Sequence, residues 1–343
     1  MSRTLDQPVF NQYSTCNPHA INMTSPKVCV IIVNWNGGDF LQRCLADLHR
    51  QTLPPHEIIV LDNASTDGSA QKVAAQFPQV RLIDAGSNLG FAAGNNLAVQ
   101  RAAPECDWIA LLNPDAFAAP DWLQTLVAAV AQYPACAIFG SRLIDANSAA
   151  LLDGIGDAYH LSGLVWREAH GKAMTPETLQ AKEIFSSCAA AALYRRDIFE
   201  ALGGFDEDYF CYVEDVDLGF RYRLLGHQVR YVPDSIVYHV GSALTGRASD
   251  FSIYYGQRNL VWTFVKDMPG YLFWCLLPLH IALNFFSVAY FSVRGRSKVI
   301  WRAKLDALKG LPKIWRKRRA LQKLRRAQPG AIWKMLNKDF VRR

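Results

Sequence analysis

The sequence predicts an α/β fold with a mostly parallel sheet flanked by helices, followed by a different C-terminal helical region. Short apolar segments alternate with helical patterns over residues 28–133, which is the arrangement of βαβ units. These apolar segments are continuous rather than alternating, as in strands that are covered on both faces. Residues 266–343 lack this alternation, so we assign them to a separate region.

Four strand–helix units follow one another in the first part of the chain. Apolar, β-rich runs mark the strands, and apolar residues on one face mark the helices. The strands are expected at Val28–Val33, Glu57–Leu61, Val80–Ile83 and Trp108–Leu112, and the helices near Phe40–Arg50, from Ser69 toward Gln76, from Phe91 to about Ala102, and at Trp122–Tyr133. Ligands of such sheets bind beyond the carboxyl ends of the strands, where Asp62, Asn88 and Asp115 lie.

The middle of the chain is less periodic. Residues from about 142 to 175 indicate loops with short strands, and a helix at Asp215–Leu225 precedes a strand near Val229–Val232. The predicted organisation is therefore a flexible leader at 1–26, an α/β domain at 27–265, and an apolar, then basic region at 266–343. The leader has no apolar stretch of the kind found in signal peptides, so no secretory signal is expected.

The eight cysteines are scattered along the chain and form no CxxC pair. This spacing predicts reduced, packed thiols in a cytosolic compartment. It argues against a disulfide framework and against a zinc site.

Phe210–Arg223 is the most unusual segment of the sequence. Three carboxylates, Glu214, Asp215 and Asp217, stand within four residues at the start of an expected helix. A helix N-terminus favours an acidic side chain by about 0.3–1 kcal/mol, which explains one of the three as a cap. Because neighbouring carboxylates raise one another's pKa, the cluster suggests a bound cation or a proton-transfer task, such as deprotonation of a hydroxyl by Asp215.

Three further polar residues follow strands, and each has two interpretations. Asp115, in an Asn-Pro-Asp turn, fits a Mg²⁺ or Mn²⁺ ligand that bridges diphosphate oxygens, or a common turn. Asp62 fits an acceptor for a base or ribose, or a cap. His239 fits a metal ligand or a buried structural imidazole. The residues alone leave these alternatives open.

The motifs VIIVNWNG, VLDNASTDGS, NLGFAAGNN, LLNPDA, GGFDEDYFCYVEDVDLGFR, YHVGSA and YYGQRN occur in this order over about residues 28–265. Together they resemble family 2 glycosyltransferases, and more narrowly the bacterial rhamnosyltransferase-like members. The resemblance implies the GT-A fold with a Rossmann-like nucleotide-binding half. It also implies an inverting transfer from a nucleotide sugar that depends on Mg²⁺ or Mn²⁺.

The resemblance also assigns residues to the nucleotide. Asn34 and Asp62 would flank the base, and Asn88 and Asn95 would help to hold the nucleoside. Arg258 would face the diphosphate or the acceptor.

For catalysis, the resemblance implies that Asp115 binds the metal and diphosphate and that His239 assists it. Asp215 would be the general base, with Glu214 beside it. Asn113 stands where the strict motif has Asp, and one carboxylate fewer predicts weaker metal binding.

The donor that the resemblance favours is dTDP-rhamnose, and a UDP- or GDP-sugar stays an alternative. The expected acceptor is a glycolipid or lipid-linked saccharide of cell-envelope polysaccharide synthesis. A non-catalytic, nucleotide-binding membrane scaffold is a second class of function. A dinucleotide-dependent oxidoreductase is disfavoured, because the turn after the first strand lacks GxGxxG.

Tyr271–Val293 contains 23 residues without a formal charge, enough to span a bilayer. From Arg294 onward, eighteen Lys and Arg stand against two Asp, a net charge of +16, which leaves 7 − 16 = −9 for residues 1–293. A single crossing would place this basic tail outside, against the positive-inside tendency. We therefore expect the apolar segment to re-enter or lie in the interface, at the cytoplasmic face of the inner membrane. The tail would bind an anionic membrane surface rather than nucleic acid.

Overall fold

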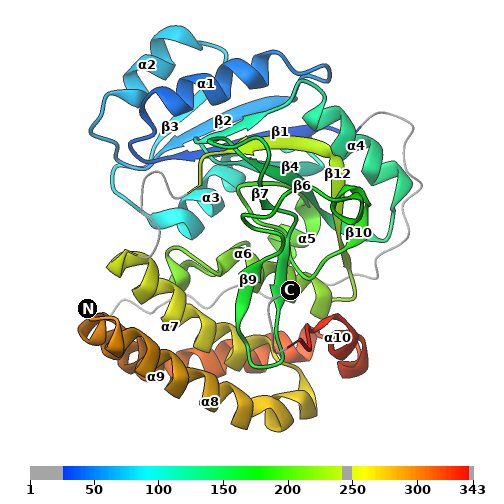
Figure 1. Cartoon of the computed structure of the whole chain (residues 1–343). Helices are drawn as coiled ribbons and strands as arrows, with labels where there is room; N and C mark the ends of the chain where they lie inside the picture. Colours follow the sequence, from blue (N-terminus) through cyan, green and yellow to red (C-terminus); the bar gives the residue numbers. More distant parts are fainter. Residues whose placement is uncertain (1–25, 242–248, 340–343) are drawn as a thin grey trace, which may run out of the picture.

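Ten strands form one sheet in the computed structural model, which describes residues 26–241 and 249–339 (Figure 1). The strand order is β10-β12-β6-β11-β4-β1-β2-β3, with β5 paired to β12 and β7 to β6. The bounds are β1 Val28–Asn34, β2 Glu57–Asp62, β3 Arg81–Asp84, β4 Trp108–Leu112, β5 Ala116–Ala118, β6 Cys136–Asp145, β7 Leu152–Gly154, β10 Lys182–Glu183, β11 Ala191–Arg195 and β12 Gln228–His239. A hairpin of β8 (Asp157–Tyr159) and β9 (Val165–Arg167) forms a second, two-stranded sheet.

Helices cover both faces of the large sheet. Their bounds are α1 Gly38–His49, α2 Ser69–Gln76, α3 Gly90–Arg101, α4 Trp122–Gln132, α5 Arg196–Ala201, α6 Glu214–Leu224, α7 Asp250–Asp267, α8 Gly270–Val293, α9 Ser297–Leu324 and α10 Pro329–Met335, with 3-10 turns at Pro176–Leu179 and Glu207–Tyr209. Alternate residues of β1 enter two hydrophobic clusters, one shared with α1, α2 and α4 and the other with α3, α5 and α6. The α/β fold with covered strands is therefore confirmed.

The sheet is parallel in the half that the sequence predicts. β1 pairs in parallel with both β2 and β4, and β2 with β3. The sequence does not predict β11, which lies antiparallel between β4 and β6. Alanine is a poor strand former, so the neighbouring strands, rather than local propensity, make the Ala-Ala-Leu-Tyr-Arg segment a strand.

β12 is longer than its predicted core at Val229–Val232 and carries the chain to His239. It pairs in parallel with β6, and the register shifts between Val232 and Ile236. Such an irregularity re-aims the side chains that follow it. As a result, His239 is buried beside the turn that follows β4.

The C-terminal helices form a layer against one end of the α/β core, at the bottom of Figure 1. A third hydrophobic cluster joins α6 and α7 to α8, α9 and α10. Trp262 of α7 donates its indole N–H to the Ala307 carbonyl of α9 at 3.0 Å, and Arg318 of α9 donates to the Val265 carbonyl at 2.8 Å. The expected boundary near residue 265 thus falls within α7, which packs against both parts.

A strained segment connects the 3-10 turn at Glu207–Tyr209 to α6. Phe210, Tyr212 and Val213 have φ angles of 64°, 69° and 69°, a left-handed conformation that is costly for bulky residues and clusters at functional sites. The Phe210 carbonyl accepts hydrogen bonds from Phe91 N and Ala92 N. Only a glycine fits at position 90 (φ 78°), because a Cβ at this position would lie 2.7 Å from the Phe210 carbonyl oxygen.

We predict that Gly90→Ala destabilises the protein more than Gly86→Ala does. Both glycines are left-handed, at φ 78° and 70°, but a Cβ at Gly86 has no atom within 4 Å. Gly86→Ala should cost about 1–2 kcal/mol in backbone strain, and Gly90→Ala about 1–3 kcal/mol more from overpacking. Urea unfolding of both variants checks this, and equal losses would show that Gly90 does not support the Phe210 loop.

Candidate active site

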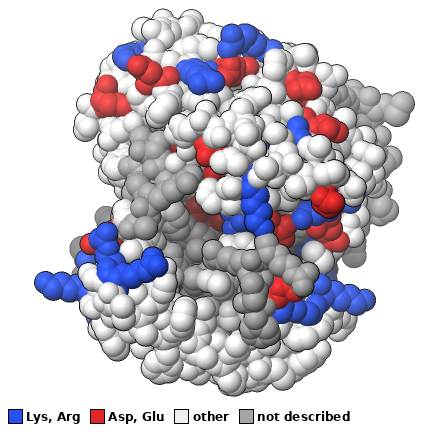
Figure 2. Space-filling model, viewed as in Figure 1, with Lys and Arg blue, Asp and Glu red and all other residues white. Residues whose placement is uncertain are grey.

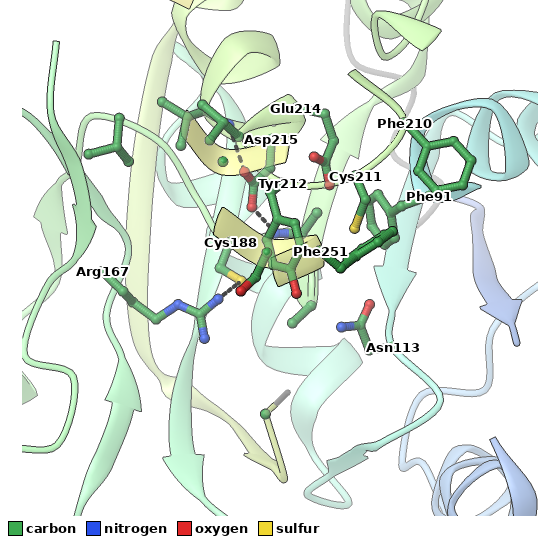
Figure 3. A pocket seen from close by; sticks show the side chains of 18 of the residues that line it. Phe91, Asn113, Arg167, Cys188, Phe210, Cys211, Tyr212, Glu214, Asp215 and Phe251 are labelled. Atoms are coloured by element: carbon green, nitrogen blue, oxygen red, sulfur yellow. Dashed lines mark hydrogen bonds between the residues drawn. The ribbon is translucent and has the colours of Figure 1, made fainter. Parts of the chain in front are cut away.

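A cavity of about 850 Å³ opens at the carboxyl ends of β1 and β4. The sheet supplies Val33 and the turn that contains Asn113 and Asp115, and the segment 210–216 supplies another part of the lining. Residues of α7 and Phe291 of α8 complete it. Figure 3 shows the side chains that point into this space. This is the position at which the fold class predicts a ligand.

Asp115 and His239 meet in the cavity lining, as the sequence predicts. Asp115 Oδ1 lies 3.4 Å from His239 Nε2. The other ring nitrogen, Nδ1, lies 2.8 Å from Asp153 Oδ2. All three side chains are buried, and two carboxylates thus hold one imidazole between them.

This contact changes the pKa of both His239 and Asp153. Burial alone lowers the pKa of His239, but the hydrogen bonds with Asp115 and Asp153 raise it above its ordinary value. Burial alone raises the pKa of Asp153, but the hydrogen bond with His239 and the charge of Arg167 lower it below its ordinary range. The geometry therefore favours an ionised Asp153 behind the imidazole.

Three acidic side chains form a second group in the lining: Glu214 and Asp215 at the N-terminus of α6, and Asp157 of β8. Asp215 Oδ1 accepts from Val216 N at 2.8 Å, and its Oδ2 accepts from Ala189 N at 3.2 Å (Figure 3). Glu214 Oε2 and Asp157 Oδ2 are buried and have no hydrogen-bond partner in the described part of the chain.

The three carboxyl groups titrate together. Burial, followed by the charge of Asp215, raises the pKa of both Glu214 and Asp157 well above the ordinary value. Burial also raises the pKa of Asp215, but its backbone donors and Arg167 oppose this shift. We infer that Asp215 holds the negative charge of the group, because only its oxygens both receive backbone hydrogen bonds.

Arg167 links the two groups of side chains. The β8–β9 register pairs Asp157 with Arg167. The guanidinium donates to Asp153 Oδ2 at 2.5 Å and to Cys188 Sγ at 2.8 Å, and Figure 3 shows it directed toward Cys188. Its charge also acts on Asp157 and Asp215. The positive charge of Arg167 therefore stabilises carboxylates in both groups, Asp153 in the first and Asp157 and Asp215 in the second.

The third carboxylate of the acidic segment has a different role. Asp217 is fully buried and does not line the cavity. It accepts from Arg221 at 2.8 Å and pairs with Lys266 at 2.5 Å. Asp217 thus belongs to an ion-paired network between α6 and α7, and only Glu214 and Asp215 face the cavity.

Asn34 and Asp62 are the last residues of β1 and β2, and their side chains are hydrogen-bonded to each other. The fully buried Asn34 amide donates to Asp62 Oδ1 at 2.9 Å and to the hydroxyls of Ser65 and Ser69. Asp62 Oδ2 accepts from Ser65 N at 3.1 Å. Neither side chain lines the cavity. Here they fix the turn after β2, and contact with a base stays a prediction.

Asn88 lines the cavity and is exposed, with its Oδ1 bonded to Asn63 Nδ2 and Gly90 N. Asn95 is buried within α3, where its amide donates to the Phe91 carbonyl at 2.9 Å. Asn95 is not part of the lining. Of this predicted pair, the structure thus exposes only Asn88 to a ligand.

Arg258 and Asn259 hold the strained segment from α7. Arg258 donates to the carbonyls of Asp208 and Tyr209, and Asn259 donates to those of Tyr209, Cys211 and Tyr212 at 2.8–3.0 Å. Arg258 is buried and outside the lining. In this structure it positions the loop before Glu214, and a contact with diphosphate or acceptor stays a prediction.

Sequence reasoning missed Asp153, Asp157 and Arg167. All three lie between 142 and 175, where the sequence predicts loops and short strands without a motif. The β8–β9 pairing and the neighbouring β7 bring them to the cavity. An Asp-x₃-Asp spacing was the only local signal, and it is common elsewhere.

Comparison with known proteins identifies the family. The model of Glycosyl transferase family 2 matches residues 29–203, just over half of the chain. The chain belongs to glycosyl transferase family 2. It is 32% identical over 240 residues to the N-acetylglucosaminyl-diphospho-decaprenol L-rhamnosyltransferase of Mycobacterium tuberculosis, which covers 64% of this chain and 77% of that protein.

Another relative of this glycosyltransferase is the O-antigen chain rhamnosyltransferase RfbN of Salmonella typhimurium, 29% identical over 62% of this chain and 66% of that protein. Among solved structures, GalNAc-T7 with UDP, GalNAc and Mn²⁺ matches with a TM-score of 0.57 at 17% identity, over 71% of this chain and 48% of that one. The mannosyltransferase PcManGT from Pyrobaculum calidifontis, in complex with GDP-Man and Mn²⁺, matches with a TM-score of 0.51 at 19% identity, over 91% of this chain and 88% of that one. These similarities show the GT-A fold.

The glycosyltransferase has side chains that fit a divalent cation. Asp115 offers a carboxylate oxygen and His239 offers Nε2, 3.4 Å apart. A carboxylate behind the other ring nitrogen, here Asp153, is the usual support of a metal-binding histidine. Asn113 reaches His239 Nε2 with its amide at 3.5 Å and adds no charge. The carboxylate of Asp115 suits Mg²⁺ or Mn²⁺, and of these two cations the softer Mn²⁺ accepts an imidazole ligand more readily.

We predict that Asp153→Asn weakens Mn²⁺ binding by about 10–100-fold, the usual loss when a carboxylate that orients a metal-binding histidine is removed. Electron paramagnetic resonance of free Mn²⁺, with UDP or dTDP present, measures the affinity. Asp234→Asn, at an exposed position on β12, the strand that carries His239, is the matched control. Wild-type affinity in Asp153→Asn would show that His239 does not depend on this support.

Proposed function

We propose that this glycosyltransferase is an inverting rhamnosyltransferase that moves rhamnose from dTDP-rhamnose to a lipid-linked saccharide in cell-envelope polysaccharide synthesis. The observation on which the proposal rests is the pairing, in one cavity, of the Asp115–His239–Asp153 group with Asp215. The two relatives named above as rhamnosyltransferases support the sugar, and the Mycobacterium tuberculosis name supports a diphospho-polyprenol acceptor.

The chain's own residues suggest how the donor is held. Asp115 and His239 would hold Mg²⁺ or Mn²⁺, which neutralises charge on a diphosphate leaving group. Asn88 lines the same cavity and offers its exposed side-chain amide to a nucleoside, while the buried Asn63 donates to Asn88 Oδ1 and holds it in place. Gly90, with a φ of 78°, and the aromatic ring of Phe210 form the part of the cavity lining beside these residues.

Asp215 is the residue best placed to accept the acceptor's proton. Its two backbone hydrogen bonds fix the carboxylate at the start of α6, and its raised pKa makes it a stronger proton acceptor than an ordinary Asp. Glu214 and Asp157, with pKa values raised further, stay protonated more readily and would offer hydrogen bonds to acceptor hydroxyls.

Aromatic side chains provide a platform for a saccharide. Phe210 stacks on Tyr255 with ring centroids 5.1 Å apart, and Phe251 contacts Phe210, Tyr212 and Tyr255 at 6.2, 6.1 and 4.7 Å. Phe210, Tyr212 and Phe251 line the cavity next to Glu214 (Figure 3). We infer that the acceptor sugar lies against these rings.

The C-terminal layer presents an apolar surface that fits a membrane. α8 is long and apolar enough, by length and composition, to cross a bilayer. The large exposed apolar side chains of α8 and α9 are Tyr271, Trp274, Ile281, Phe285, Phe286, Tyr290, Val293, Trp301, Leu305 and Leu308. Figure 2 shows the lower lobe almost free of charge, with Lys and Arg at its two sides.

We infer that α8 and α9 lie in the interface of the inner membrane's cytoplasmic face rather than span it. α8 packs against α7, α9 and α10, and a spanning helix would have to leave these partners. The basic borders would contact anionic headgroups. Phe291 of α8 also lines the cavity, so a lipid-linked acceptor would reach Asp215 from the membrane side.

We expect Asp215→Asn to lower turnover by about 10²–10⁴-fold, the scale of a lost general base, while dTDP affinity stays within twofold. Transfer is measured with dTDP-rhamnose and a polyprenyl-diphosphate N-acetylglucosamine acceptor, and binding by calorimetry. Asp197→Asn, at an exposed site on α5, is the control. Undiminished turnover would show that Asp215 is not the general base. Transfer from UDP- or GDP-sugars but not from dTDP-rhamnose would show that the proposed donor is wrong.

The double variant Phe285→Ser and Phe286→Ser should bind anionic vesicles at least tenfold more weakly, because each fully buried Phe contributes about 1.5–3 kcal/mol. Both side chains are more than 60% exposed, so folding should be unaffected. Vesicle flotation measures binding, and Leu179→Ser, an exposed apolar residue outside the C-terminal layer, is the control. Equal flotation of both variants would contradict the proposed membrane face.

A further inference from the structure

A second cluster of ligand-type side chains lies at the opposite, amino-terminal edge of the parallel strands. Cys29 near the start of β1, Glu57 at the start of β2, and Cys106 just before β4 converge there. The two sulfurs and a Glu57 carboxylate oxygen all lie within 4.8 Å of one another. Among the described residues, no other group of three or more His, Cys, Asp or Glu side chains converges so closely.

The spacing of these atoms matches a tetrahedral site. With Zn–S bonds of about 2.3 Å and Zn–O bonds of about 2.0–2.2 Å, neighbouring ligand atoms stand roughly 3.6–3.8 Å apart. Cys29 Sγ and Glu57 Oε2 are 3.7 Å apart. This distance agrees with a tetrahedral site, and the other two pairs of ligand atoms lie within 4.8 Å.

The backbone around the cluster is held firmly. Parallel pairing sets Cys29 directly beside Glu57. Glu57 Oε2 accepts from Ala103 N at 2.8 Å and Oε1 from Arg81 at 3.0 Å. Cys106 N donates to the Ala103 carbonyl at 3.1 Å, so the carboxylate and the second thiol are fixed to the same short loop. Ligands that are oriented in advance lose little freedom when a metal binds.

We propose that Cys29, Glu57 and Cys106 bind a thiophilic divalent cation, with Zn²⁺ as the best match. Thiolates select Zn²⁺ over Mg²⁺ and Mn²⁺, so this site is chemically distinct from the oxygen and imidazole ligands of Asp115 and His239. Binding would release the two thiol protons to solvent. The side chain of Glu57 is 17% exposed, so the cation would reach the two buried thiols from the side of Glu57.

The bound cation would join three segments that are far apart in sequence. It would tie the start of β1 to the start of β2 and to the loop before β4, at the end of the sheet remote from the catalytic cavity. The role is therefore structural, and it does not depend on the proposed transfer reaction. The sequence predicts no zinc site because it has no CxxC pair. In the fold, strand pairing brings the three ligands together although they are far apart in the sequence.

Cobalt substitution of the reduced, metal-free full chain tests the site. We expect one equivalent of Co²⁺ to give thiolate-to-metal charge-transfer absorption that Zn²⁺ abolishes. Asp115→Ala and Cys136→Ser should keep this absorption, since Asp115 belongs to the catalytic cavity and Cys136 is a buried thiol outside the cluster. Cys106→Ser should remove it, and Glu57→Gln should weaken Co²⁺ binding at least tenfold.

Two results would overturn the proposal. One is the absence of a charge-transfer band in the folded wild-type chain, which needs no variant. The other is an unchanged band in Cys106→Ser. If Cys106→Ser does not fold, native mass spectrometry of the wild-type and Glu57→Gln chains replaces it: one Zn²⁺ per chain is expected in the wild type, and equal Zn²⁺ occupancy in Glu57→Gln counts against the site.

Discussion

The candidate site depends on how Arg167 and His239 hold five carboxylates around one cavity. Asp115, Asp153, Asp157, Glu214 and Asp215 all line it, and such a concentration of buried acids is electrostatically unfavourable by itself. His239 lies between Asp115 and Asp153, and Arg167 contacts Asp153 while its charge also acts on Asp157 and Asp215. These contacts offset the repulsion within the cluster, and a bound divalent cation would offset it further.

The second constraint is the backbone that delivers Glu214 and Asp215. The left-handed residues before α6 need support from outside the segment, because their conformation is locally unfavourable. Phe91 N and Ala92 N support the Phe210 carbonyl from α3, and Asn259 supports three carbonyls from α7. This gives the Gln-Arg-Asn motif a physical role even without a ligand contact, since it joins the C-terminal helices to the acidic group.

The same arrangement would couple the proposed membrane face to catalysis. α7 packs against α9 on one side and holds the acidic segment on the other, while α8 carries both the exposed apolar surface and Phe291 of the cavity. A glycosyltransferase built in this way would place its acceptor opening at the bilayer surface. A lipid-linked acceptor then needs to move only its saccharide away from the headgroups.

The sequence by itself determined the four βα units, because continuous apolar strands and amphipathic helices are local patterns. It also showed the acidic and polar residues that follow the strands, while the family resemblance placed Asp115 with His239 at a metal and Asp215 at the reaction. The residue pattern alone did not separate Asp217 from Asp215, because it does not show which side of the helix N-terminus faces the cavity. Only the tertiary structure decided that Asp153, Asp157 and Arg167 join the site and that Cys29, Glu57 and Cys106 converge. These contacts arise from strand pairing between distant segments, and pairing geometry leaves no periodic signal in the chain.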